Sequence, residues 1–351
     1  MEMQIDGPMD DLIDDSSLGT ATARRRRRLA GDRSVDAVRL RISRGPAGSA
    51  EEIRDRARRL AAAYPQQPVG SLIEELLGLQ DDVLQLVQRG RRAREVLVYA
   101  AIVSGMLAKA SHDLGDPRCA NEHARTAYLC ADSAGHHGLR TWVCGLQSLV
   151  SYWAGWQHEA LRYARMGAVM SERTYGSSAV WVASLEARAW ALLGNHKDAV
   201  AALARAEACR DASLIDDLDE IGGILTFSQP QQLYYAADTL ALLPRLAEDT
   251  ERAASRALAA YATAEHVTRS FSDEAGARTD LAVALVRLGD PGGARRALEP
   301  VLELLVSQRI NGIVSSVNRV RAELAEQAAG DPAARELRAE IASFIGAAAL
   351  S

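Results

Sequence analysis

Cysteine is scarce in this sequence of 351 residues, and its four copies form no C-x-x-C pair. This pattern argues against a disulfide scaffold and against a zinc ribbon. Runs of β-branched residues are few, and strands would need alternation rich in valine and isoleucine. No apolar run reaches the roughly 18 residues of a membrane span, and the N-terminus has no apolar signal core. These absences predict a cytoplasmic protein without a membrane partner.

Alanine and leucine dominate what is present, a composition typical of closely packed helices. Residues 1–15 hold six acidic residues and no basic one, whereas residues 16–60 hold 13 arginines against five acids. We expect residues 1–48 to form a disordered acidic and basic arm. Its run Arg24–Arg28 could neutralise nucleic-acid phosphates or form a solvated tail. A nucleic-acid partner is expected only through this run.

A glycine followed five residues later by an alanine occurs four times between segments that could be helical. A small residue stands seven positions before each glycine, and another stands twelve positions after three of them. The first three glycines are 40 and 39 residues apart, and the gap of 95 before the fourth leaves room for one degenerate copy. The four pairs are Gly115/Ala120, Gly155/Ala160, Gly194/Ala199 and Gly289/Ala294.

A unit of this length that recurs as a pair of helices is the signature of an α-solenoid. The glycine would end the first helix in the left-handed conformation, and the alanine would let the second helix approach closely. The sequence therefore predicts an all-α fold, with 211–230 as its longest irregular stretch and no role assigned to that stretch. Helices are expected at 49–64, 71–89, 92–114, 117–134, 139–154, 157–173, 178–193, 196–210, 230–243, 249–266, 273–288, 292–307, 311–328 and 332–348.

Two copies of the unit resemble the L-G-x-x-x-x-A…A core of the tetratricopeptide repeat family. They are Leu114–Gly115–Ala120–Ala127 and Leu193–Gly194–Ala199–Ala206. The resemblance implies that residues 49–351 form a right-handed α-solenoid of helix hairpins. The chain departs from the family because the proline at the end of the second helix is missing.

A second resemblance covers roughly residues 70–325. The segments "LQSLVSYWAGW" (146–156), "FSDEAGAR" (271–278) and "QRINGIVSSV" (308–317) are similar to the C-terminal repeat region of actinobacterial transcriptional regulators of the XRE or GntR type. This resemblance implies that the repeats sense a ligand or pair subunits, so a homodimer is one expected partner. The helix-turn-helix that those regulators carry is not recognisable in the first 70 residues.

The repeat resemblance also implies which residues line a concave groove, at fixed positions before each closing glycine. Aromatic rings beside cations would suit an extended or small anionic ligand. The alternative is that the tryptophans fill the core between repeats. The groove positions singled out are Lys109, His112, Trp142, Tyr152, Trp181 and Arg188.

No motif with a catalytic context is found, so no catalytic residue, cofactor or metal is assigned. The cluster Asp216–Glu220 could hold a cation or cap a helix. We expect a regulatory scaffold that binds a peptide, protein or small molecule in its groove. The alternative is a solenoid recruited to a biosynthetic pathway as an enzyme or as a small-molecule-binding accessory protein.

Overall fold

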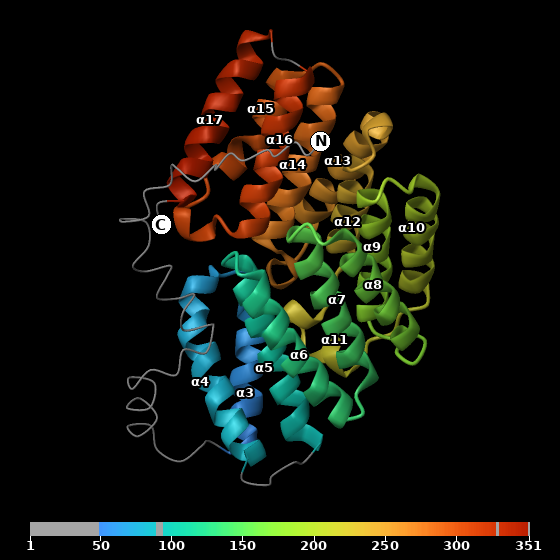
Figure 1. Ribbon diagram of the computed structural model, residues 1–351, viewed down its shortest axis with the longest axis vertical. Helices are drawn as coiled ribbons and strands as arrows, with labels where there is room; N and C mark the ends of the chain where they lie inside the picture. The colour runs from blue at the N-terminus through green and yellow to red at the C-terminus, as the bar shows by residue number, and fades with distance from the viewer. Residues whose placement is uncertain (1–48, 89–93, 328–329, 350–351) are drawn as a thin grey trace, which may run out of the picture.

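The computed structural model describes residues 49–88, 94–327 and 330–349 (Figure 1). Within these ranges the chain is all-helical and has no strand. The arm at 1–48 and its arginine run lie outside the described residues. The first eight described α-helices are α3 (Ala50–Ala63), α4 (Val69–Gln88), α5 (Arg94–Asp113), α6 (Pro117–Ser133), α7 (His137–Trp153), α8 (Gln157–Ser171), α9 (Ser178–Leu192) and α10 (His196–Asp211). The others are α11 (Asp217–Ile221), α12 (Gln229–Ala241), α13 (Ala247–Thr263), α14 (Phe271–Arg287), α15 (Pro291–Leu302), α16 (Asn311–Gln327) and α17 (Pro332–Ala349).

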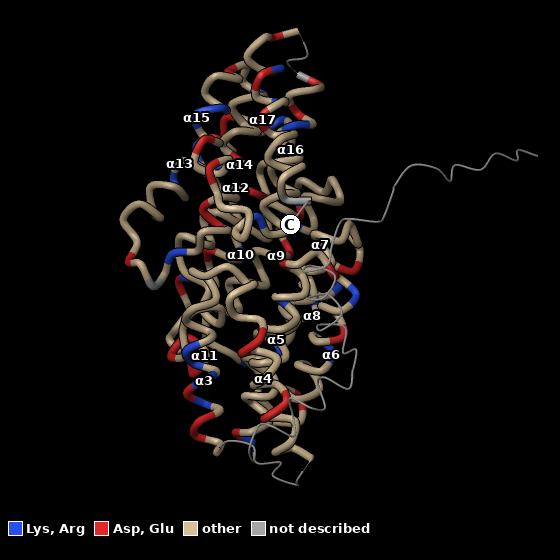
Figure 2. The backbone as a smooth tube through the Cα atoms, turned by 90° about the vertical axis from the view of Figure 1, so that its left-hand side faces the viewer, with Lys and Arg blue, Asp and Glu red and all other residues tan. Residues whose placement is uncertain are grey.

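The helices pack in neighbouring pairs: α5 with α6, α7 with α8, α9 with α10, α12 with α13, α14 with α15, and α16 with α17. The first helix of each pair also contacts the first helix of the next pair. We call α5, α7, α9, α12, α14 and α16 the inner helices. The two views show an elongated body, with α3 and α4 toward one end and α17 toward the other (Figure 1 and Figure 2).

The four glycines of the repeated interval do end helices in the left-handed conformation, as predicted. Gly115, Gly155, Gly194 and Gly289 have φ values of 77°, 75°, 74° and 82°. After each glycine, the next backbone N–H bonds the carbonyl five residues earlier, and at Asp116 this bond is 2.8 Å long. This is the Schellman arrangement, which satisfies carbonyls that the helix end would leave unbonded.

The four alanines of the interval are completely buried, at 0% exposure each. The small residues seven positions before the glycines are buried as well, and they lie on the partner helix of the hairpin. In one hairpin the two positions bond directly, because Ser148 Oγ donates to the carbonyl oxygen of Ala160 at 2.8 Å. The interval therefore marks a fully buried contact between two paired helices.

Replacing Ala199 by Leu is expected to lower the free energy of unfolding by about 1–3 kcal/mol, because overpacking a filled contact forces backbone or rotamer shifts. Urea unfolding followed by far-UV circular dichroism measures this change. The matched control is Val200→Leu, since Val200 is the next residue on α10 and is 44% exposed. Equal stability of both variants and the unchanged chain would contradict the close-packing interpretation.

The segment between α10 and α12 contains the short helix α11 and a 3₁₀ turn at Gly223–Leu225. The carboxylate of Asp216 accepts the backbone N–H groups of Leu218 and Asp219 at 2.9 Å each. The acidic cluster at 216–220 therefore caps a helix, which is one of the two interpretations that the sequence left open.

The same segment crosses the molecule to reach α3. Gly223 has φ of 60°, and a Cβ atom at this position would lie 2.0 Å from the carbonyl oxygen of Ala61. Only glycine allows this approach of two backbones. Farther along, the N–H of Phe227 donates to Ser177 Oγ at 2.8 Å. We call residues 212–228 the wall segment, because it forms one wall of the cavity described below.

The first and last inner helices meet. Helix α16 contacts α5, and the turn before α16 contacts α4. Two bonds join the turn after α3 to the segment that leads into α14. The N–H of Phe271 donates to the carbonyl of Pro65 at 3.4 Å, and Gln66 Nε2 donates to the carbonyl of His266 at 3.1 Å. The helix pairs therefore surround a central space.

No helix in the described ranges has both the length and the apolarity needed to cross a bilayer.

Candidate ligand cavity

Two adjoining cavities lie among the inner helices. The residues that line both of them are Lys109, Asp113, Leu149, Tyr235, Ser272, Asp273 and Ile310. The first cavity reaches toward the wall segment and the second toward α16. Their volumes, as space open to the centres of water molecules, are about 80 and 50 Å³. One ordered water needs roughly 10–15 Å³ on this scale, so the cavities have room for several waters or a small ligand.

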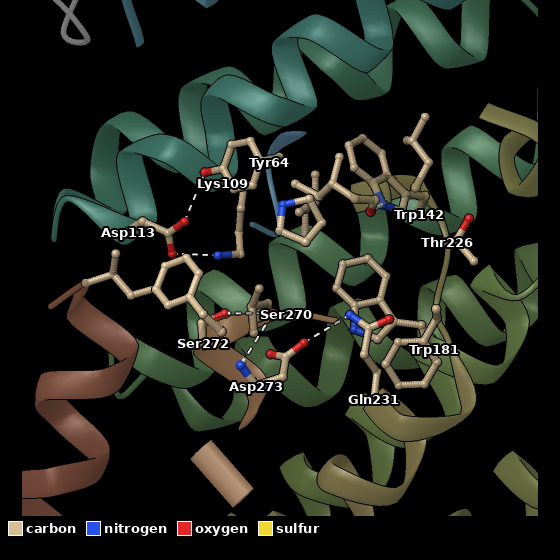
Figure 3. A pocket seen from close by; sticks show the side chains of 18 of the residues that line it. Tyr64, Lys109, Asp113, Trp142, Trp181, Thr226, Gln231, Ser270, Ser272 and Asp273 are labelled. Carbon is tan, nitrogen blue, oxygen red and sulfur yellow. Dashed lines mark hydrogen bonds and ion pairs between the residues drawn. The ribbon is translucent and has the colours of Figure 1, made fainter. Parts of the chain in front are cut away.

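Aromatic side chains form the wall of the first cavity on the side of α7, α9 and the wall segment (Figure 3). Trp142 Nε1 donates to the carbonyl of Ile224 at 3.1 Å, which fastens the wall segment to α7. Trp181 Nε1 donates to the hydroxyl of Tyr235 at 3.2 Å. The ring of Phe227 meets that of Tyr235 edge to face at 5.1 Å. The indole N–H groups are thus satisfied within the protein, and the rings offer the ligand apolar surface.

Glycines on the inner helices make room for the two indoles. A Cβ atom at Gly105 would lie 2.2 Å from the ring of Trp142, and one at Gly145 would lie 2.6 Å from the ring of Trp181. Each indole therefore packs against the backbone of the preceding inner helix. As a result Trp142 is only 1% exposed and Trp181 only 8%. Each ring packs between helices, as the core interpretation predicts, and each also lines the first cavity. The interpretation that these rings bind a ligand stays a prediction.

Lys109 lies on the side of the cavity formed by α5, and a carboxylate already neutralises it (Figure 3). Lys109 Nζ lies 2.5 Å from Asp113 Oδ1, and the hydroxyl of Tyr64 donates to Asp113 Oδ2 at 2.9 Å. Burial and the neighbouring carboxylate raise the pKa of Tyr64 well above its usual value, so its hydroxyl stays a donor. The carboxylate of Asp113 therefore binds both the ammonium group of Lys109 and the hydroxyl of Tyr64.

Asp273, at the start of α14, is half-buried, and among the described residues its carboxylate forms no ion pair. Its Oδ2 accepts a hydrogen bond of 3.0 Å from Gln231 Nε2 (Figure 3). Burial raises the pKa of Asp273 above its usual value. The hydrogen bonds with Gln231 and Ser270 and the charges of Lys109 and Arg188 offset this rise only in part.

A buried ionic network lies beside the second cavity and joins four inner helices. Arg188 Nε lies 2.8 Å from Asp238 Oδ2, and Arg319 Nη2 lies 2.8 Å from Asp238 Oδ1 and 2.6 Å from Asp280 Oδ1. Burial opposes ionisation of Asp238, but the two guanidinium groups hold its pKa below the usual value. Burial and the charge of Asp238 raise the pKa of Asp280 well above the usual value, so this pair holds one charge.

Five of the six groove positions predicted from the sequence line one or both of the cavities. Lys109 lines both cavities, and Trp142 and Trp181 line the first. His112 and Arg188 line the second cavity. Tyr152 lines neither, and its ring stacks on the guanidinium of Arg188 at 4.0 Å. Burial lowers the pKa of His112 to about 4, so its imidazole is neutral at physiological pH.

Several cavity residues were missed by sequence reasoning. Gln231 and Asp273 occupy the first turns of α12 and α14, and Phe227 comes from the wall segment. The predicted groove positions stand at fixed distances before closing glycines. The α12/α13 pair has no such glycine, and Asp273 stands 16 positions before Gly289, outside those distances. The capping pattern that begins at Ser270 was the available signal, because it places Asp273 in a first helical turn.

Compared with known proteins, the chain matches no family model and no curated protein sequence.

Among the described residues, no group of three or more His, Cys, Asp and Glu side chains is arranged to hold a metal ion. Cys119 and Cys144 are buried, and burial raises the pKa of their thiols to about 11 and about 12.

Proposed function

We propose that this chain is a right-handed α-solenoid of tetratricopeptide-like hairpins that acts in the cytoplasm as a ligand-responsive regulatory protein. The repeated glycine–alanine hairpins and the consecutive contacts of the inner helices support this architecture. The regulator resemblance of segments 146–156, 271–278 and 308–317 supports the regulatory role. In such a scaffold, ligand occupancy acts by changing how neighbouring pairs pack.

The cavity among the inner helices is the observation that carries this proposal. It combines aromatic walls with a few polar groups, which is the usual make-up of small-molecule sites. The wall segment, and the bonds between the turn after α3 and the segment before α14, narrow the central space. This enclosure favours a small molecule, or one inserted side chain of a partner, over an extended peptide. A pathway accessory protein would use the same cavity.

The test is binding of a neutral probe of suitable size, 2-phenylethanol, followed by ligand-observed saturation-transfer NMR. We expect one saturable site that Ser272→Trp blocks, because Ser272 lies between the two cavities and an indole there would fill them. The matched control is Ser255→Trp on α13, which is exposed and lines neither cavity.

Melting curves of both variants establish that they are folded before binding is compared. Binding that persists in Ser272→Trp, or that Ser255→Trp lowers equally, would contradict a ligand site among the inner helices.

A further inference from the structure

We infer that the first cavity recognises an organic cation, an amine with an aromatic or branched aliphatic body, whose charged group pairs with Asp273. This inference rests on the proposed function, because it names the ligand class of the same cavity. The observation behind it is a carboxylate without an ion-pair partner in the described part of the chain, set beside aromatic walls.

The carboxylate of Asp273 is held toward the cavity by two capping arrangements. Its backbone N–H donates to Ser270 Oγ at 3.4 Å, which fixes the first turn of α14. Gln231 belongs to the cap of α12, where its Oε1 accepts the N–H of Ser228 at 2.8 Å. The amide nitrogen of Gln231 must therefore point the other way, and it donates to Asp273. Asp273 accepts this bond and keeps capacity for a further donor.

The other charged side chains that line the first cavity are Lys109 and Asp113, and they pair with each other. Asp273 therefore leaves the lining of the first cavity with an excess negative charge. A carboxylate that is partly withdrawn from water is stabilised by a cationic partner, and a ligand cation would supply that partner.

The walls define the rest of the ligand. Trp181, Phe227 and Tyr235 present ring surface to the same cavity. Such surface attracts a cation and also buries an apolar body. A small inorganic cation would leave this surface unused, and an anion would meet the charge of Asp273. The combination fits a monocation with an apolar body.

Three probes of one shape and different charge test this inference: 2-phenylethylamine, 2-phenylethanol and phenylacetate. Dissociation constants from NMR titration should rank the amine tightest and phenylacetate weakest. Asp273→Asn should weaken the amine roughly tenfold to a hundredfold, the range of a hydrogen bond to a charged group. Binding of the neutral alcohol should stay within about twofold of its value in the unchanged chain, because it needs no carboxylate.

The matched control is Glu274→Gln. Glu274 is the next residue, is acidic and half-buried, pairs with Arg269 and Arg278, and lines neither cavity. This variant should keep the preference for the amine. One outcome would contradict the cation inference and leave the proposed function standing: Ser272→Trp blocks all three probes, but phenylacetate binds with the same affinity as the amine. If Ser272→Trp blocks the binding of none of the probes, both the cation inference and the proposed function are contradicted.

Two further measurements separate ligand recognition from a structural role of Asp273. Because the pKa of Asp273 is raised, its protonated form gains population as the pH falls, and amine binding should weaken through that pKa. Alcohol binding should not change, and Asp273→Asn should remove the pH dependence of amine binding. The charged and titratable groups that face Asp273 are Lys109, His112, Asp113, Arg188, Tyr234, Tyr235, Tyr261 and Glu274.

The second measurement is the melting temperature at pH 7 without ligand. A carboxyl whose folded-state pKa is raised destabilises the fold above that pKa, so Asp273→Asn should melt at the same or a higher temperature. A lower melting temperature, together with unchanged amine affinity, would identify Asp273 as a helix-capping residue only and overturn the inference.

Discussion

Asp238→Ala is expected to lower the free energy of unfolding by about 3–5 kcal/mol, the cost of leaving a buried charge without its partner. Arg188 is 1% exposed and would keep no carboxylate within ion-pair distance among the described residues. The hydroxyl of Tyr152, which donates to Asp238 at 3.3 Å, would lose its acceptor. Urea unfolding followed by circular dichroism measures the loss.

The matched control for this prediction is Asp55→Ala. Asp55 pairs with Arg54 on the surface of α3, and its side chain is 57% exposed. Exposed pairs contribute about 0–1 kcal/mol, so this variant should unfold at almost the same urea concentration as the unchanged chain. If Asp238→Ala lowers the free energy of unfolding no more than Asp55→Ala does, the prediction is wrong. In that case Asp280 can supply the negative charge that Asp238 supplies in the unchanged chain.

Trp142→Ala is expected to lower the free energy of unfolding by about 3–5 kcal/mol, as for other large aromatic side chains removed from a core. The ring packs against the backbone at Gly105, and its N–H holds the wall segment through Ile224. The variant leaves a void between α5 and α7 and releases one wall of the cavity. Urea unfolding gives the stability, and NMR titration with 2-phenylethanol gives the effect on binding.

Trp156→Ala provides the comparison, because Trp156 is 37% exposed and makes no side-chain cap to α8. Its loss should change stability by less than about 1 kcal/mol. If Trp142→Ala instead melts like the unchanged chain and loses only probe binding, Trp142 serves the ligand surface and not the core.

Much of the helical layout could be predicted because its signals are local. Left-handed glycines, caps and apolar periodicity act within a few residues, so the predicted and observed helices agree closely. The largest disagreement is the helix predicted at 292–307, which ends at Leu302. Helix α11 was missed because five residues are too few to show a period.

The cavity could be predicted only in part because it depends on distant contacts. The cavity residues that the closing glycines predict lie on α5, α7 and α9. Each of these helices ends at such a glycine, so the same spacing applies to all three. Gln231 and Asp273 meet across 42 positions, and the wall segment reaches α3 across more than a hundred. No local pattern encodes such meetings, since they depend on how all the intervening helices stack.

The contact between Gln66 and His266, 200 positions apart, has a consequence for how this chain can evolve. Arrays whose units touch only their neighbours can gain or lose a unit by duplication or deletion. Here one added pair between α3 and α14 would separate Pro65 from Phe271 and open the central space. We therefore expect homologous chains to keep the number of pairs between these helices and to vary in the length of their outer turns.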